Sequence, residues 1–164
     1  MRGILAVALA VVLAGCATAH RIDNGVYHSP RGYRITLPGP EWRLVEDSAA
    51  DLELRTGGRA GMLVTAVCGE APSRAADSVL LRRVLFGLRE RHVIERGDVL
   101  VNGARGARAV VEGIAEGGGD RLRVEAYVVR HGACVYDFLY AAPPDGFEQW
   151  RPAFTRLVDS FATE

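Results

Sequence analysis

Only a few residues of this chain have the types and spacing that catalysis or metal binding requires. Asp137 is a carboxylate inside an apolar segment, where burial would raise its pKa and let it donate a proton. An aspartate bonded to the backbone or to an arginine is the simpler interpretation of the same pattern. His131 and Cys134 could supply two metal ligands, but a metal site needs roughly three or four. A hydrolase or metal-dependent enzyme with a site near Asp137 is therefore the alternative hypothesis for function.

Composition narrows the chemistry further. The 164 residues include 20 basic and 20 acidic side chains, so the formal net charge is zero and a nucleic acid is not expected as a partner. Every basic residue is an arginine, which excludes a Schiff-base lysine and the lysine of a phosphate-binding loop. The sequence also contains no Gly-x-Ser-x-Gly elbow and no His-Glu-x-x-His motif. We therefore expect a protein that is not an enzyme and that uses no cofactor and no metal.

The most specific motif lies at the N-terminus. Residues 4–13 form a continuous apolar run that has the length of a signal-peptide core and falls short of the roughly 20 residues that span a bilayer. The sequence Leu-Ala-Gly-Cys at residues 13–16 follows directly and looks like a bacterial lipobox, in which the thiol of Cys16 takes a diacylglycerol. Ordinary secretory cleavage at Ala-Thr-Ala, residues 17–19, is the alternative. We expect residues 1–15 to be a lipoprotein signal peptide and Cys16 to be the lipidated residue.

Lipidation would anchor the mature chain to a lipid bilayer through Cys16. Residues 16–25 contain few apolar side chains and are expected to form a short tether, followed by one folded domain at residues 26–164. In known lipoproteins an aspartate after the lipidated cysteine marks retention in the inner membrane, and this chain has Ala17 there. In a Gram-negative host we expect it at the outer membrane, facing the periplasm, with an envelope protein or a small ligand as partner.

Hydropathy patterns predict a helix between two groups of strands. Residues 73–91 place apolar side chains near one face of an amphipathic helix of about five turns. Arg82, Arg83 and Arg89 lie elsewhere on its surface, where a solvated face is a simpler interpretation than an anion site. Alternating or continuous apolar residues between Pro and Gly turns predict the strands before it. These expected strands are residues 26–29, 33–37, 42–45, 51–55 and 61–68.

Regularly spaced turn sequences predict an antiparallel meander after the helix. Asn102 and Gly103 between apolar segments are a strong hairpin signal, and glycines at 117–119 and 132 mark two further turns. In the third strand of this meander, apolar residues are expected on one face and Glu125 on the other. The expected strands are residues 93–101, 104–115, 120–130 and 133–141.

A second helix is predicted to close the domain. Asp145 and Glu148 have the spacing of a capping box, and apolar residues recur at steps of three and four from Phe147 to Phe161. Pro152 lies inside this pattern and should kink or interrupt the helix near Arg151.

The order of the elements also predicts a disulfide. If strand 61–68 runs up, the helix returns the chain and three hairpins make strand 133–141 run down, so that Cys68 and Cys134 lie at the same end of the sheet. If these two strands are neighbours, opposed residues come close enough for a disulfide, and an oxidising compartment lets the bond form. Two separate buried thiols are the alternative.

Residues near both ends of the domain resemble the PsbP-like superfamily, which includes a photosystem oxygen-evolving subunit, a Ran-binding nuclear transport factor and many small bacterial lipoproteins. The matching residues are Tyr27, Ser29, Pro30, Gly32, Tyr33, Ile35, Leu37, Pro38 and Trp42, and then Phe154, Val158, Ser160 and Phe161. The resemblance implies an α+β fold: an α/β/α sandwich with a curved, mainly antiparallel sheet, one crossover helix and a C-terminal helix. It also implies a binding or assembly role, so the predicted function is that of a membrane-anchored, non-catalytic lipoprotein of the cell envelope. No functional residue is transferred, because the matching positions build core and turns.

Overall fold

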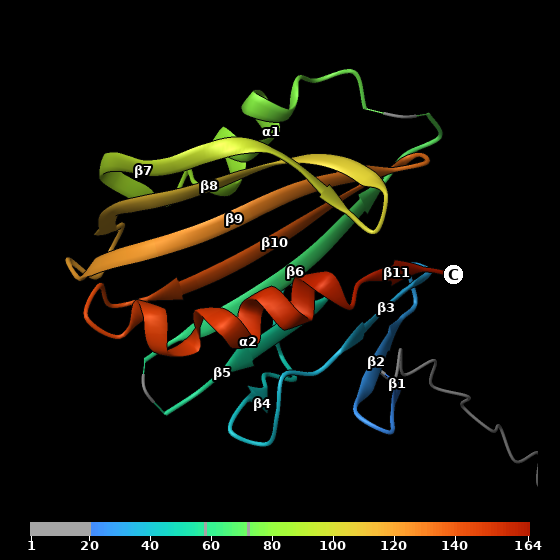
Figure 1. The fold of residues 1–164 in the computed structure, drawn as a ribbon, viewed down its shortest axis with the longest axis horizontal. Coiled ribbons are helices and arrows are strands. Elements are labelled where there is room, and N and C mark those ends of the chain that lie inside the picture. Colours follow the sequence, from blue (N-terminus) through green and yellow to red (C-terminus); the bar gives the residue numbers. More distant parts are fainter. Residues whose placement is uncertain (1–20, 58, 72) are drawn as a thin grey trace, which may run out of the picture.

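Short strands, a long meander and two helices make up the computed structural model, which describes residues 21–57, 59–71 and 73–164. The strands are β1 (Arg21–Asp23), β2 (Val26–Ser29), β3 (Tyr33–Thr36), β4 (Arg43–Leu44), β5 (Leu52–Arg55), β6 (Gly61–Cys68), β7 (Leu88–Val101), β8 (Ala104–Ala115), β9 (Arg121–His131), β10 (Cys134–Ala142) and β11 (Ala162–Thr163). The helices are α1 (Asp77–Val84) and α2 (Phe147–Asp159). Among these residues the strands form a small sheet, β1-β2-β3-β11, and a seven-stranded sheet, β4-β5-β6-β10-β9-β8-β7 (Figure 1).

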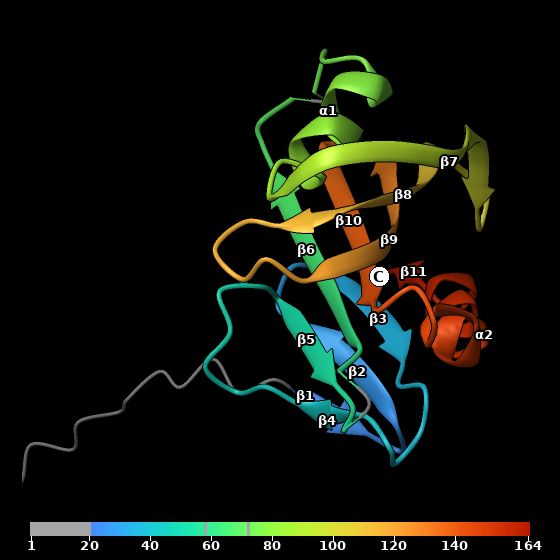
Figure 2. The same cartoon turned by 90° about the vertical axis from the view of Figure 1, so that its left-hand side faces the viewer.

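The two faces of the seven-stranded sheet are covered differently. Helix α2 and the small sheet pack on one face, where aromatic side chains such as Tyr33, Phe138 and Phe154 form a continuous core. Helix α1 packs on the opposite face at one end of the sheet, with Leu81 and other leucines against small side chains of β8 and β9. Figure 2 shows the two helices at separate positions around the curved sheet. This is the predicted α+β sandwich, and the fold prediction is confirmed.

The size of the side chains on each face of the large sheet explains which layer packs against that face. Along β10, Tyr136, Phe138 and Tyr140 alternate toward α2 and are buried, which fits the large rings of that core. On the α1 face, Ala107 and Ala126 are buried instead, and their small side chains let a helix approach the strands closely. The alternation of large and small residues along the strands therefore decides which layer packs where.

The first helix is much shorter than predicted. We expected residues 73–91, but α1 ends at Val84 and β7 begins at Leu88. Gly87 is unfavourable in a helix by about 1 kcal/mol, and its carbonyl accepts a hydrogen bond from the backbone N–H of Glu116 at 2.9 Å. Pairing with β8 therefore replaces the last helical turns, although apolar residues continue at helical spacing up to Leu88.

Three smaller predictions also need correction. Strand β1 pairs with β2, so the sheet begins inside the segment 16–25 that we expected to be a tether. The N-cap of α2 is Gly146 without a side-chain hydrogen bond, so Asp145 and Glu148 form no capping box. Helix α2 continues through Pro152. Both Pro152 and Glu148, the residue whose carbonyl loses its intrahelical bond, are exposed, so that this end of the helix remains accessible to water.

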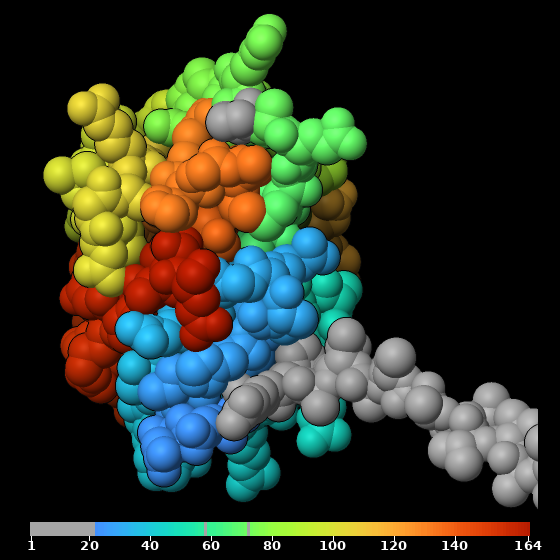
Figure 3. Space-filling model, turned by 90° about the vertical axis from the view of Figure 1, so that its right-hand side faces the viewer, coloured from blue at the N-terminus to red at the C-terminus, as the bar shows by residue number. Residues whose placement is uncertain are grey.

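The C-terminal residues close the fold against the first strands. Strand β11 pairs with β3, and the backbone N–H of Glu164 donates to the carbonyl of Gly32 at 2.9 Å. Figure 3 shows this end of the chain, in red, packed directly against the blue N-terminal strands. Phe161, just before β11, has its ring centroid 4.7 Å from that of Tyr136 and 5.2 Å from that of Phe138. The closing segment is therefore part of the core.

We predict that Phe161→Ala destabilises the domain strongly. Phe161 is 2% exposed, and removing a buried phenylalanine costs about 3–5 kcal/mol because a cavity is left among its neighbours. The free energy of unfolding from urea titration measures this loss. Phe86→Ala is the matched control, because Phe86 is 78% exposed and surface changes usually stay within about 0.5 kcal/mol. Equal urea midpoints for both variants would contradict the assignment of Phe161 to the core.

Candidate functional site

Cys68 and Cys134 are joined at the junction of the two halves of the large sheet. They are directly opposed in the register of β6 and β10, with Cα atoms 4.0 Å apart and a disulfide between them. The backbone N–H of Gly69 donates to the carbonyl of Ala133 at 3.1 Å, which makes the cysteines a non-hydrogen-bonded pair, the position where opposed side chains approach most closely. The structure therefore contains the disulfide predicted from the up-and-down order of the strands.

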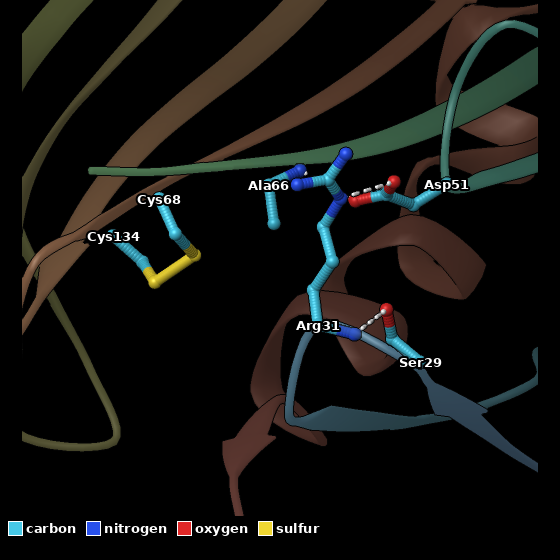
Figure 4. The surroundings of a disulfide bond; sticks show 6 residues. All are labelled: Ser29, Arg31, Asp51, Ala66, Cys68 and Cys134. Carbon is cyan, nitrogen blue, oxygen red and sulfur yellow. Dashed lines mark hydrogen bonds and ion pairs between the residues drawn. A yellow bond between two sulfur atoms is a disulfide. The ribbon is translucent and has the colours of Figure 1, made fainter. Parts of the chain in front are cut away.

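A carboxylate near this disulfide connects the two sheets. In Figure 4, Asp51 reaches both Arg31, in the turn after β2, and Ala66 in β6. The distances are 3.0 Å from Oδ1 to the Arg31 Nε and 2.7 Å from Oδ2 to the backbone nitrogen of Ala66. Because both carboxylate oxygens accept hydrogen bonds from structural partners, we assign Asp51 to packing of the sheets rather than to chemistry.

Asp137 lines a cavity beside the disulfide, on the α1 face of the sheet. The cavity has a volume of about 190 Å³, and its lining includes Cys68, Leu80 and Arg83. The Oδ1 atom of Asp137 is buried and has no hydrogen-bond partner in the described part of the chain. Burial raises the pKa of this carboxyl to about 6, and the positive charge of Arg83 opposes the rise. The structure therefore favours the buried acid over the interpretation that the sequence made simpler, an aspartate bonded to the backbone or to an arginine.

The described residues do not bring further catalytic or metal-binding groups to Asp137. The lining of its cavity contains no second carboxylate and no histidine among them, although convergent groups of this kind would have favoured an enzyme. His131 is exposed, and the sulfur of Cys134 is bonded to Cys68, so these two do not form a metal site. In the ranges described, no three His, Cys, Asp or Glu side chains are grouped to hold a metal.

A second cavity, on the other side of α1, was not predicted from the sequence. It also measures about 190 Å³ and lies between α1 and strands β7 and β8. Its apolar part is formed by Leu81, Leu85, Val93, Ala109 and Val111, and its polar part by Ser78, Arg82, Arg91 and Arg96. We refer to it as the arginine cavity. The predicted helix 73–91 was too long and contained both Arg82 and Arg91, whereas in the structure Arg82 belongs to α1 and Arg91 to β7. A cavity between these two elements could therefore not be predicted.

The opposite face of the sheet carries a network of ion pairs. Glu125 is 1% exposed, and its carboxylate bonds Arg108 of β8 at 2.5 Å and Arg151 of α2 at 2.9 Å. Glu95 of β7 bonds the same two arginines, at 2.8 and 3.4 Å. Burial alone would lower the pKa of Arg108, but its hydrogen bonds with Glu125 and Glu95 outweigh this and raise it. Glu125 therefore lies on the face opposite the small apolar residues of β9, as the strand pattern predicted, and α2 covers it there.

The lipidation motif is not part of this geometry. Cys16 and the signal peptide predicted at residues 1–15 lie outside the described residues. Within the described ranges, no helix has the length and apolar character needed to cross a membrane.

We predict that the disulfide is formed in the exported protein and contributes to its stability. The bond spans a sequence separation of 66 residues, for which the chain-entropy argument gives about 4 kcal/mol. Thiol titration of denatured, unreduced Cys16→Ser protein from the envelope should find no free thiol, and two after reduction. Two free thiols before reduction would contradict the bond.

We also predict that Asp137 makes stability depend on pH. Its folded-state pKa of about 6 lies about two units above that of an unfolded aspartate, so the folded state holds the proton more tightly. The stabilisation is full below about pH 4 and is lost as pH rises through 6. Asp137→Asn should therefore be more stable than the wild type at pH 8, by about 3 kcal/mol, and equal to it at pH 4.

Arg83→Gln provides the matched variant for this measurement. Loss of the opposing positive charge should move the loss of stability to higher pH. A stability difference between Asp137→Asn and the wild type that stays constant from pH 4 to pH 8 would show that the carboxyl does not titrate as proposed.

Comparison with known proteins gives similarity of fold. No family model and no curated protein sequence matches the chain. The solution structure of cyanobacterial PsbP (CyanoP) from Synechocystis sp. PCC 6803 is similar with a TM-score of 0.61 and 14% identity over 85% of this chain and 91% of that one. LpqN of Mycobacterium tuberculosis, involved in cell envelope biogenesis, has a TM-score of 0.60 and 14% identity over 84% and 88% of the two chains. PA94 of Pseudomonas aeruginosa, a protein of unknown function, has a TM-score of 0.53 and 12% identity over 75% and 81%. The chain therefore has the PsbP-like fold.

Proposed function

We propose that this chain is a lipid-anchored, non-catalytic binding module of the cell envelope. The observation that carries the proposal is the incomplete cover of the α1 face of the large sheet. Helix α1 has eight residues, and next to the area that it covers lies an open hollow of about 510 Å³ whose lining includes Leu63, Leu122 and Leu139. Ligand sites in proteins are typically concave and mostly apolar, with volumes of about 300–1,000 Å³.

Other observations support the envelope as the location. A lipobox-like sequence ends at Cys16, and disulfides such as Cys68–Cys134 persist mainly in oxidising compartments outside the cytosol. LpqN, which has a similar fold, is involved in cell envelope biogenesis. In this proposal the acylated Cys16 binds the lipid bilayer, at the outer membrane in a Gram-negative host, and the α1 face meets an envelope protein or a small ligand.

We predict that Cys16→Ser abolishes lipidation. Palmitate labelling in cells should mark the wild type, which should fractionate with membranes, and it should not mark the variant. The double variant Cys68→Ser/Cys134→Ser is the matched control, because it removes the other two cysteines and should keep the label. A label that persists in Cys16→Ser would contradict the anchor.

Crosslinking in intact cells tests the binding role of the same protein. Adducts of the wild type should disappear when Leu139→Arg places a charge in the open hollow. Thr155→Arg changes an exposed residue of α2 and should leave them unchanged. Adducts that are insensitive to Leu139→Arg would contradict binding by this face.

A further inference from the structure

The arginine cavity combines an apolar wall with three positive charges. Arg82 comes from α1, and Arg91 and Arg96 come from β7, which lies beside α1 at the edge of the sheet (Figure 1). Arg91 donates from Nη1 to the carbonyl of Leu85 at 3.5 Å, which holds its side chain against the end of the helix. The lining contains Ser78 as a further donor and no carboxylate.

These three arginines differ from the arginines on the opposite face. There, Arg108 is bonded to two glutamates and Arg151 to three. Over the residues that the structure describes, no carboxylate forms an ion pair with Arg82, Arg91 or Arg96. Guanidinium groups present rigid donors that suit carboxylates and phosphates. The cavity therefore has the charge to receive an anion.

A local irregularity of β7 places Arg91 and Arg96 on the same face of the strand. In a regular strand, residues 91, 93 and 95 would share one face, so that Glu95 would lie on the face of Arg91 and Arg96 on the other face. The register shifts between Val93 and Glu95, which pair with Val111 and Val110. This bulge exchanges the faces, so that Glu95 joins Arg108 on the α2 side and Arg96 joins Arg91 in the cavity. Bulges often re-aim side chains in this way at functional sites.

Size and lining limit the apolar part of the ligand. A cavity of about 150 Å³ lined by apolar side chains can hold benzene, and the arginine cavity measures about 190 Å³. Its apolar wall therefore fits a ring or a hydrocarbon chain of about six to eight carbons. A small inorganic anion would leave this wall exposed to water, and a neutral hydrocarbon would leave the arginines without a partner.

We propose that the arginine cavity binds an amphiphilic organic anion, a carboxylate or phosphate attached to a hydrocarbon chain. The anionic group contacts Arg82, Arg91 and Arg96, and the first carbons of the chain lie against Leu85 and Val93. This inference rests on the proposed function, because it assigns a ligand class to the α1 face, which is the binding face in that proposal.

The test is calorimetric titration of the full chain carrying Cys16→Ser with octyl phosphate and octanoate below their micelle concentrations. Both should bind, and affinity should rise from ethyl phosphate to octyl phosphate because more apolar surface is buried. Octyl glucoside, which has no charge, and inorganic phosphate, which has no chain, should each bind at least about tenfold more weakly.

Variants locate the binding. Arg82→Gln and Arg96→Gln should each weaken octyl phosphate about tenfold, because each loses one charge-assisted contact. Arg156→Gln is the matched control, an exposed arginine of a helix on α2, and should leave the affinity unchanged. An equal loss in Arg156→Gln would show general charge attraction and would overturn the site.

Each remaining outcome also decides the proposal. If octyl glucoside binds as tightly as octyl phosphate, the cavity binds apolar chains without using its arginines, and the proposal is wrong. If inorganic phosphate binds as tightly, the arginines bind anions without using the apolar wall, and the proposal is also wrong. Binding to vesicles of anionic phospholipid without binding of octyl phosphate would make this face a membrane contact instead. None of these results bears on palmitate labelling of Cys16, so failure of the ligand proposal and failure of the anchored envelope function are distinguishable.

Discussion

The pairing of β6 with β10 is the constraint on which the rest of the structure depends. It joins the N-terminal strands β4, β5 and β6 to the meander of β10, β9, β8 and β7, and the disulfide fixes its register at Cys68 and Cys134. Because side chains alternate along a strand, a slip by one residue would exchange the two faces of the strand. The rings of Tyr136 and Phe138 would then face α1, and Asp137 would enter the aromatic core. Both the core and the binding face thus depend on one register.

Much of this arrangement could be predicted from the sequence, because each turn sequence fixes the direction of the strand that follows it. Asn102 and Gly103 have positive φ values of 47° and 80°, as a tight hairpin turn requires, and a run of hairpins determines strand direction without any knowledge of packing. Direction alone placed Cys68 and Cys134 at one end of the sheet. The extent of α1 could not be predicted in this way, since the choice between a last helical turn and pairing with β8 depends on tertiary contacts that periodicity does not contain.

The candidate sites likewise differ in how far they could be predicted from the sequence. Asp137 could be identified because a carboxylate among apolar strand residues is unusual whatever the fold, but its cavity, its raised pKa and the nearby Arg83 come from the packing of α1. The arginine cavity left no signal. Strand alternation counted back from the turn at 102–103 places Glu95 and Arg96 on opposite faces. The same count gives no sign that Arg91 shares the face of Arg96, because the bulge between Val93 and Glu95 reverses the alternation.

Cover by a helix explains why unpaired charge collects on the α1 side. Under α2, Glu125 is nearly inaccessible to solvent, and a buried charge without a partner is strongly destabilising, so every charge there must be matched, as Glu125 is by Arg108 and Arg151. On the α1 face the helix is short and the arginines of its cavity are exposed, so water stabilises them without a carboxylate partner. This face can therefore keep Arg82, Arg91 and Arg96 available for a ligand. The short α1 and the bulge in β7 therefore act together: the first leaves the face open, and the second removes from it the carboxylate of Glu95, which would otherwise lie on the same face as Arg91.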